Sequence, residues 1–142
     1  MLGGELGSDP APVQAARTPA ALKGVTGQIV DAAFSVHSRL GPGLLEAVYE
    51  ACLEHELQKR GLWVQRQVAL PLVYDSLHFE LAYRLDMLVE NCVIVELKSV
   101  EAVSAVHKAQ LKTYLKLSGH RVGLLVNFNV ALIKHGITRV EL

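Results

Sequence analysis

The chain has 142 residues, of which 51% are hydrophobic and 20% charged, and its 14 basic residues balance 14 acidic ones. This composition fits one folded domain and excludes both a natively disordered chain and a membrane span, since charged residues interrupt even the most apolar stretch, 81–100. With zero net charge, a polyanion would have to be held by a local patch or through metal ions.

The first third of the chain predicts a tail followed by two helices. Residues 1–23 are rich in Gly, Ala and Pro and show no periodicity, so we expect a disordered tail before a domain over 24–142. Apolar residues at helical spacing predict helices over 25–40 and 44–60, separated by the break at Gly41-Pro42-Gly43.

The middle of the chain changes to short apolar or alternating runs, which predict strands. The expected strands cover residues 63–73, 77–89 and 92–99, and the turns between them lie at Asp75-Ser76 and Glu90-Asn91. Pro71 favours an edge position for the first of these strands.

The last part predicts a helix over 103–118, a strand over 121–127, and a short strand or extended end over 137–142. The order α-α-β-β-β-α-β indicates an α/β domain of three layers, in which helices flank a mixed sheet. Cys52 and Cys92 form no CxxC pair and no secretory signal is recognised, so we expect reduced cysteines and a cytoplasmic protein.

Three charged side chains come close together in the hairpin predicted over 77–99. Strand residues alternate between faces, so Glu96 and Lys98 share one face. In a three-residue loop centred on Asn91, Asp86 lies opposite Glu96, whereas a two-residue turn would place Asp86 on the other face. A site that uses all three groups therefore requires the register centred on Asn91.

Two interpretations of this hairpin stay open. Mg²⁺ prefers one or two carboxylates together with water and phosphate oxygens, so it would relieve the repulsion between Asp86 and Glu96. Such a metal activates water and polarises a phosphodiester, and Lys98 would orient the water or neutralise phosphate charge. Alternatively, Lys98 forms an ion pair with Glu96 or Asp86 at the edge of the sheet.

Polar residues on the flanking helices also have two explanations each. Glu46 shares a helix face with Tyr49, and its place in the first turn is typical of an acidic residue that stabilises the helix dipole. Gln110 and Tyr114 are i,i+4 neighbours on the later helix, where a tyrosine is more typical of the core.

A basic stripe on the same later helix is formed by Lys108, Lys112 and Lys116. It is typical of a solvated helix face, although it would also follow a phosphate backbone. The six histidines show no zinc-binding spacing, and the chain has no P-loop and no nucleophile elbow.

Four motifs in order carry a resemblance to a known family. Residues 43–49 read GLLEAVY, which fits GxxExxY, and they are followed by YRLD at 83–86, VELK at 95–98 and QLKTY at 110–114. The chain therefore resembles the bacterial GxxExxY protein family, which is placed in the PD-(D/E)XK nuclease superfamily. The similarity extends over about residues 26–142.

The resemblance implies a nuclease with an α-β-β-β-α-β core that uses Mg²⁺ or Mn²⁺ at its central hairpin. It implies Asp86 and Glu96 as metal ligands, assisted by Glu46, with Lys98 as the catalytic lysine and Gln110 as a further site residue. Residues 65–67 read QRQ where the family has ERQ, which removes one carboxylate, and the proline that classically precedes the aspartate is absent.

We therefore expect a metal-dependent enzyme that hydrolyses phosphodiester bonds of nucleic acid, with DNA favoured over RNA and no membrane partner. A homodimer would help it to cut both strands of a duplex. The alternative is a nuclease-fold protein with little or no turnover that binds nucleic acid or protein. Zero net charge and modest basic patches motivate this alternative.

Overall fold

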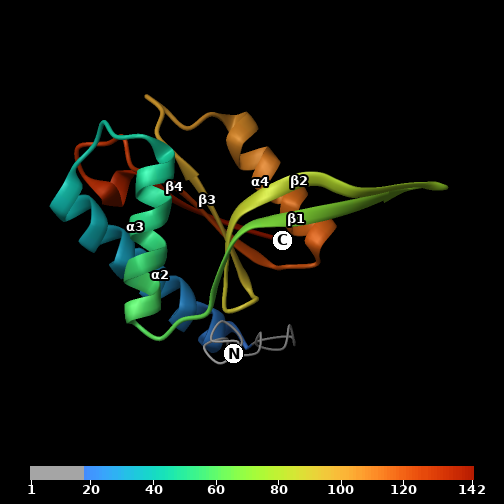
Figure 1. The fold of residues 1–142 in the computed structure, drawn as a ribbon, viewed down its shortest axis with the longest axis horizontal. Helices are drawn as coiled ribbons and strands as arrows, with labels where there is room; N and C mark the ends of the chain where they lie inside the picture. The colour runs from blue at the N-terminus through green and yellow to red at the C-terminus, as the bar shows by residue number, and fades with distance from the viewer. Residues whose placement is uncertain (1–17) are drawn as a thin grey trace, which may run out of the picture.

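The computed structural model describes residues 18–142, which contain three helices, five strands and one short 3₁₀ helix (Figure 1). In chain order they are α2 (Pro19–Leu40), α3 (Glu46–Lys59), β1 (Val64–Tyr74), β2 (Leu77–Val89), β3 (Val93–Lys98), α4 (Ala105–Ser118), β4 (Val122–Asn127), η1 (Ile133–His135) and β5 (Ile137–Glu141). Every helix and strand predicted from the sequence is present. No helix in this part of the chain is long and apolar enough to cross a membrane.

Helix α2 begins earlier than its apolar pattern predicts. The Thr18 hydroxyl accepts a hydrogen bond from the Ala21 amide at 3.1 Å, and Pro19 begins the helix, where its missing N–H is no loss. Leu22 is already buried in the core. The prediction of a tail over 1–23 is therefore wrong for residues 19–23, which belong to α2. Residues 1–17 of the predicted tail lie outside the described residues.

The sheet is mixed and has the strand order β1-β2-β3-β4-β5. All neighbours run antiparallel except β3 and β4, which are parallel and are connected through α4. A parallel pair needs such a crossover, because a tight turn cannot return the chain in the same direction. Strand β1 lies at an edge, as Pro71 predicted.

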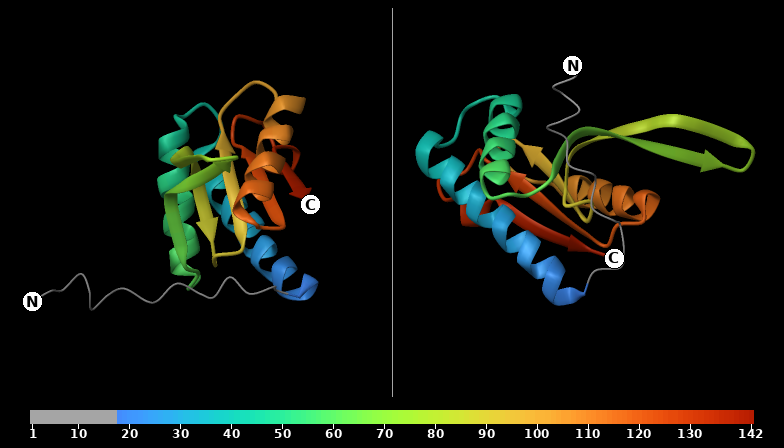
Figure 2. Two further views of the ribbon diagram at one scale, coloured as in Figure 1. Left: turned by 90° about the vertical axis from the view of Figure 1, so that its right-hand side faces the viewer. Right: turned by 60° about the horizontal axis from the view of Figure 1, so that its bottom comes forward.

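Helices cover both faces of the sheet, which confirms the expected three-layer α/β architecture. Helices α2 and α3 pack on one face, over a core that includes Ile29, Leu53 and Val95. Helix α4 packs on the other face, where Leu111 and Leu115 meet a second apolar cluster. Figure 2 shows the sheet between these two layers.

Strand β2 changes the face that it presents to the core at Asp86. Met87 and Val89 belong to the core beneath α2 and α3, whereas Tyr83 and Leu85 belong to the cluster beneath α4. A regular strand would place all four on one face, because side chains alternate with a period of two. The strand is therefore irregular at the residue predicted to bind metal.

Strand β1 is irregular at the same rung. Gln67, which stands opposite Asp86 in the register, has a φ of 53°, in the left-handed region that side chains other than glycine rarely adopt. Gln67 and Asp86 are not paired in the β1–β2 ladder. The pairs on either side, Arg66↔Met87 and Val68↔Leu85, nevertheless have the same register. Both strands thus break at one rung, between two regular stretches.

Beyond Leu70, β1 and β2 form a two-stranded arm, residues 71–82, that projects away from the body (Figure 1). The register shifts between the pairs Leu70↔Tyr83 and Leu72↔Phe79. Apart from the half-buried Leu72, the arm is exposed to solvent throughout. Its two strands are joined by the predicted turn at 75–76.

The end of β4 is fastened to the backbone that follows β3. The buried Asn127 amide donates to the Val100 carbonyl at 2.9 Å and accepts from the Val100 N–H at 3.1 Å, while Phe128 N–H donates to the Lys98 carbonyl at 3.0 Å. Gly136 lies against the same place, and a Cβ atom there would overlap the carbonyl oxygen of Asn127.

Candidate active site

The β2–β3 hairpin has the register that the predicted site requires. Its ladder runs from Met87↔Val95 to Val89↔Val93, which leaves a three-residue loop centred on Asn91. The register prediction is therefore confirmed, and Asp86 and Glu96 occupy the next rung after the last ladder pair.

At that rung, hydrogen bonds from main-chain N–H groups to the two carboxylates take the place of the main-chain hydrogen bonds that pair β2 with β3. The Asp86 N–H donates to Glu96 Oε2 at 2.8 Å, and the Leu97 N–H donates to Asp86 Oδ2 at 2.8 Å. Each carboxylate thus accepts a main-chain N–H from the other strand, which fixes both groups between β2 and β3. Among residues 18–142, Asp86 Oδ1 has no hydrogen-bond donor.

Two tyrosines support Glu96 from the side of α4. The Tyr83 hydroxyl donates to Glu96 Oε1 at 3.1 Å, and its ring stacks on Tyr114 of α4 with centroids 4.2 Å apart. Burial, followed by the negative charge of Glu96, raises the pKa of Tyr83, so its hydroxyl stays protonated and able to donate. The sequence pattern favoured a core role for Tyr114 and gave no sign of this contact, since a stacked pair from distant segments leaves no local signal.

Both carboxyl groups have raised pKa values. Burial, reinforced by the charge of Asp86, raises the pKa of Glu96 to about 7, although hydrogen bonds from Asp86 N–H and Tyr83 oppose the shift. Burial also raises the pKa of Asp86, and the negative charges of Glu50 and Glu46 add to the effect. Both carboxyl groups therefore keep their protons to higher pH than free side chains do, mainly because they are buried.

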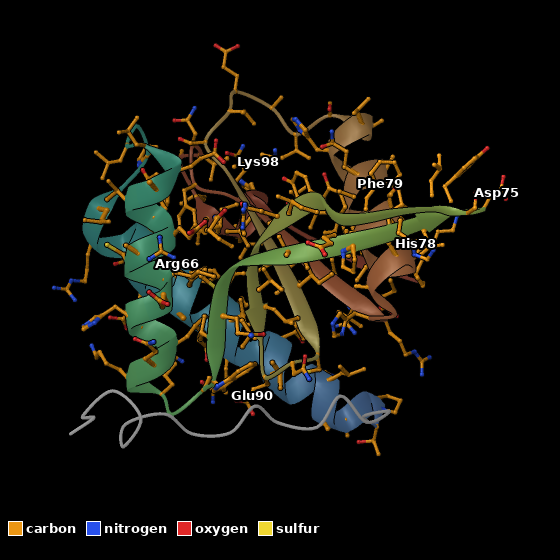
Figure 3. The ribbon with its side chains drawn as sticks, turned by 45° about the vertical axis from the view of Figure 1, so that its right-hand side comes forward. Arg66, Asp75, His78, Phe79, Glu90 and Lys98 are labelled. Atoms are coloured by element: carbon orange, nitrogen blue, oxygen red, sulfur yellow. The ribbon has the colours of Figure 1, made fainter. Side chains whose placement is uncertain are left out.

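Lys98 lies near both carboxylates without pairing with either. It is half-buried at the carboxyl end of β3 (Figure 3), and its charge lowers the pKa of both Asp86 and Glu96. It forms no ion pair with any residue in the described range 18–142. The alternative in which Lys98 simply bridges to Asp86 or Glu96 is therefore not what the structure shows.

Glu50 of α3 is a site residue that sequence reasoning missed. It is buried, accepts from Arg66 Nε at 2.7 Å, and accepts from Gln67 Nε2 at 3.2 Å. Figure 3 shows Arg66 beside α3. Arg66 and Gln67 belong to the QRQ segment, so this segment ties β1 to α3 beside Asp86. The i,i+4 spacing of Glu50 from Glu46 was the available signal.

The structure does not gather Glu46 and Gln110 with the other predicted site residues. Glu46 is exposed in the first turn of α3 and influences Asp86 only through its charge. Gln110 is exposed on α4, one turn before Tyr114, and has no contact with the rung. Within residues 18–142, no three His, Cys, Asp or Glu side chains form a cluster that could hold a metal ion by themselves.

The donor set nevertheless fits a hard divalent cation. Mg²⁺ binds through one or two carboxylates and keeps waters or phosphate oxygens as its other ligands. Asp86 and Glu96 supply that number of carboxylates, Asp86 Oδ1 is free to coordinate, and a cation held between them would favour the ionised carboxylates, which burial disfavours.

A sequence model of the PD-(D/E)XK nuclease superfamily matches residues 23–140. The chain belongs to this superfamily, whose nucleases act on nucleic acid and generally use divalent metals such as Mg²⁺. The match does not distinguish the GxxExxY family within it. Neither the comparison with curated proteins nor that with solved structures finds a match.

Proposed function

We propose that this protein is a metal-dependent nuclease of the GxxExxY type that hydrolyses phosphodiester bonds, with DNA as the favoured substrate. The observation that carries the proposal is the rung at which Asp86 and Glu96 accept each other's main-chain N–H groups beside an unpaired Lys98. A purely structural pair of buried carboxylates would be expected to have a cationic partner.

Asp86 and Glu96 would hold the metal, and Glu46 would add negative potential or contact a metal-bound water. When bound, a divalent ion polarises the phosphodiester and lowers the pKa of an attacking water. Because Tyr83 and two main-chain N–H groups fix the carboxylates, the metal ligands are oriented before substrate arrives.

Lys98 would act on the substrate rather than on the protein. Its ammonium has no ion pair in residues 18–142, so it is available to orient water or to neutralise charge on the phosphate. The exposed lysines of α4, Lys108, Lys112 and Lys116, would then follow the backbone of the nucleic acid beyond the cleaved bond.

The test is cleavage of single-stranded and duplex DNA and of RNA with Mg²⁺ or Mn²⁺. We expect Asp86→Ala and Lys98→Ala each to lose at least about 100-fold in rate, because each removes a group that stabilises developing charge. The matched controls are Asp31→Ala and Lys23→Ala, which alter exposed charges on α2. Activity that survives both site substitutions, or is lost equally in the controls, contradicts the proposal.

The second candidate function is a nuclease-fold module that binds nucleic acid or protein with little or no turnover. The exposed arm, which contains no lysine or arginine, favours a protein contact. Calorimetric titration with Mn²⁺ separates the two. A divalent site that Glu96→Gln abolishes supports the enzyme, whereas no carboxylate-dependent binding together with persistent association supports the module.

A further inference from the structure

The arm formed by residues 71–82 has one apolar face that nothing in residues 18–142 covers. Directly opposed residues of two antiparallel strands share a face, so the pairs Leu72↔Phe79 and Tyr74↔Leu77 lie together. Leu81 lies beside them in the stretch of β2 where the register shifts. Tyr74, Leu77, Phe79 and Leu81 are 47–67% exposed.

The opposite face of the arm is different in character. It presents Val73 and His78, which are paired with each other, and Glu80. Figure 3 shows His78 and Phe79 as neighbours on β2 near the tip, with Asp75 at the end. A strand pair with one apolar and one polar face is typical of a sheet that packs on one side. The arm is anchored to the sheet at its base, but a two-stranded segment gains little stability by itself in water, so a cover on this face would stabilise it.

The apolar face continues the side of the sheet that packs against α4. Leu70 and Tyr83, the last pair before the arm, belong to the cluster beneath α4. Beyond them the register shifts, with Leu72↔Phe79 as the next pair, and Leu72 follows Leu70 at a spacing of two along β1, which favours the same face. The apolar face of the arm therefore continues the sheet surface that packs against α4, but it extends beyond the end of that helix.

The charge of the arm argues against nucleic acid as the cover. Between Arg66 and Arg84 the chain has no lysine or arginine, and its charged residues there are Asp75 and Glu80. Phosphate contacts need basic side chains, and acidic ones repel the backbone. The cover is therefore a protein surface.

We propose that the apolar arm face binds the same face of a second copy, so that the protein forms a two-fold symmetric dimer. The partly exposed side chains amount to roughly 450 Å² per copy, and two copies together approach the ~1,000 Å² of a small specific interface. A two-fold axis lets one self-complementary patch serve both copies.

Charge supports this arrangement over another protein partner. With the arms face to face and antiparallel, each tip, which carries Asp75, points toward the body of the other copy on its α4 side. That side carries the exposed Lys108, Lys112 and Lys116, whereas the arm itself has no cation. The acidic tip and the basic helix are therefore complementary within the dimer. The inference does not depend on the proposed nuclease activity.

The test is sedimentation of the full chain between about 1 and 300 µM, which spans the weak end of specific association. We expect a reversible equilibrium between the 15.5 kDa chain and a species of twice that mass. Phe79→Lys should weaken the dimer on the order of 100-fold, because each dimer then buries two charges in its apolar contact.

The matched control is Val73→Lys, which adds the same charge on the other face of the arm, where Val73 is 60% exposed against 48% for Phe79. It should leave dimerisation within about threefold of wild type. Hydrogen exchange gives a second readout, since the arm amides should become protected as concentration rises. A monomer throughout the range, an arm protected at every concentration, or equal effects of both substitutions overturns the proposal.

Discussion

The two ends of one hairpin, β1–β2, differ in how their side chains are supported. At the base, near Asp86, helices cover both faces and charged groups are buried with hydrogen bonds. At the arm, no helix within residues 18–142 covers either face, and apolar groups are exposed on strands that are paired regularly only beyond the register shift, from Leu72↔Phe79 to the tip. The comparison shows that support from neighbouring elements, rather than strand propensity, decides where a buried charge is tolerated.

The base also combines irregular backbone with complete hydrogen bonding. Gln67 has a left-handed backbone and β2 changes face at Asp86, yet within residues 18–142 no buried side-chain polar atom lacks a partner. Irregular backbone that is over-determined by its contacts is typical of functional sites.

The largest expected effect is a loss of stability at the base. Leu85→Ala should lower the free energy of unfolding by about 3 kcal/mol, because Leu85 is buried beneath α4 and its removal leaves a cavity. Urea denaturation at low protein concentration measures this. A loss below about 1 kcal/mol would mean that the base is no better packed than the arm.

The next effect is a gain of stability when a buried charge is removed. The folded chain keeps the Glu96 proton up to a pKa of about 7, whereas the unfolded chain releases it near 4.5, so the folded state binds more protons between these values. The free energy of unfolding contributed by Glu96 therefore falls as pH rises through that window and stays low above it.

Glu96→Gln should consequently stabilise the metal-free protein by about 2 kcal/mol at pH 8, and by almost nothing at pH 4. Thermal and urea unfolding in EDTA at both pH values measure the difference. Asp75→Asn at the exposed arm tip is the control and should change stability little at either pH. If the Glu96→Gln protein were less stable than wild type at pH 8, burial of the ionised Glu96 carboxylate would not be destabilising the folded state.

A smaller effect is expected from the hydroxyl that binds Glu96. Tyr83→Phe should cost about 1 kcal/mol and raise the pKa of Glu96 further, because the lost hydrogen bond favours the ionised carboxylate. Carbon NMR titration of the carboxyl group reports that pKa directly. Tyr114→Phe keeps the ring stack and has no contact with Glu96, so it should shift the pKa less.

The smallest effect is expected in the arm. Leu81→Ala should change the unfolding free energy of the monomer by less than about 0.5 kcal/mol, because 47% of Leu81 is already exposed. Denaturation at a concentration below dimerisation measures it. An effect as large as that of Leu85→Ala would mean that another part of the chain covers the arm.

The element order and the hairpin register were predictable because both depend on local pattern. Alternation fixed the faces of Glu96 and Lys98, and the Asn91 loop fixed the rung of Asp86. The superfamily membership confirms that these motifs were interpreted correctly at that level.

What the sequence hid depends on contacts between distant segments. Glu50 gave no local sign of its role, because its partner Arg66 lies 16 positions away in the sequence. The left-handed Gln67 carries no glycine to mark it, and the start of α2 precedes its apolar stripe. Each feature is set by tertiary packing, which overrides local propensity.

Gly136 shows how a position far from the reacting groups can still control them. Any side chain there would displace the Asn127 carbonyl, and the segment at Asn127 holds the main chain of Lys98 and Val100. In a saturation-mutagenesis screen, position 136 should therefore behave like an active-site position. All replacements should fail alike, whatever their polarity, because the damage is steric and is transmitted through the backbone.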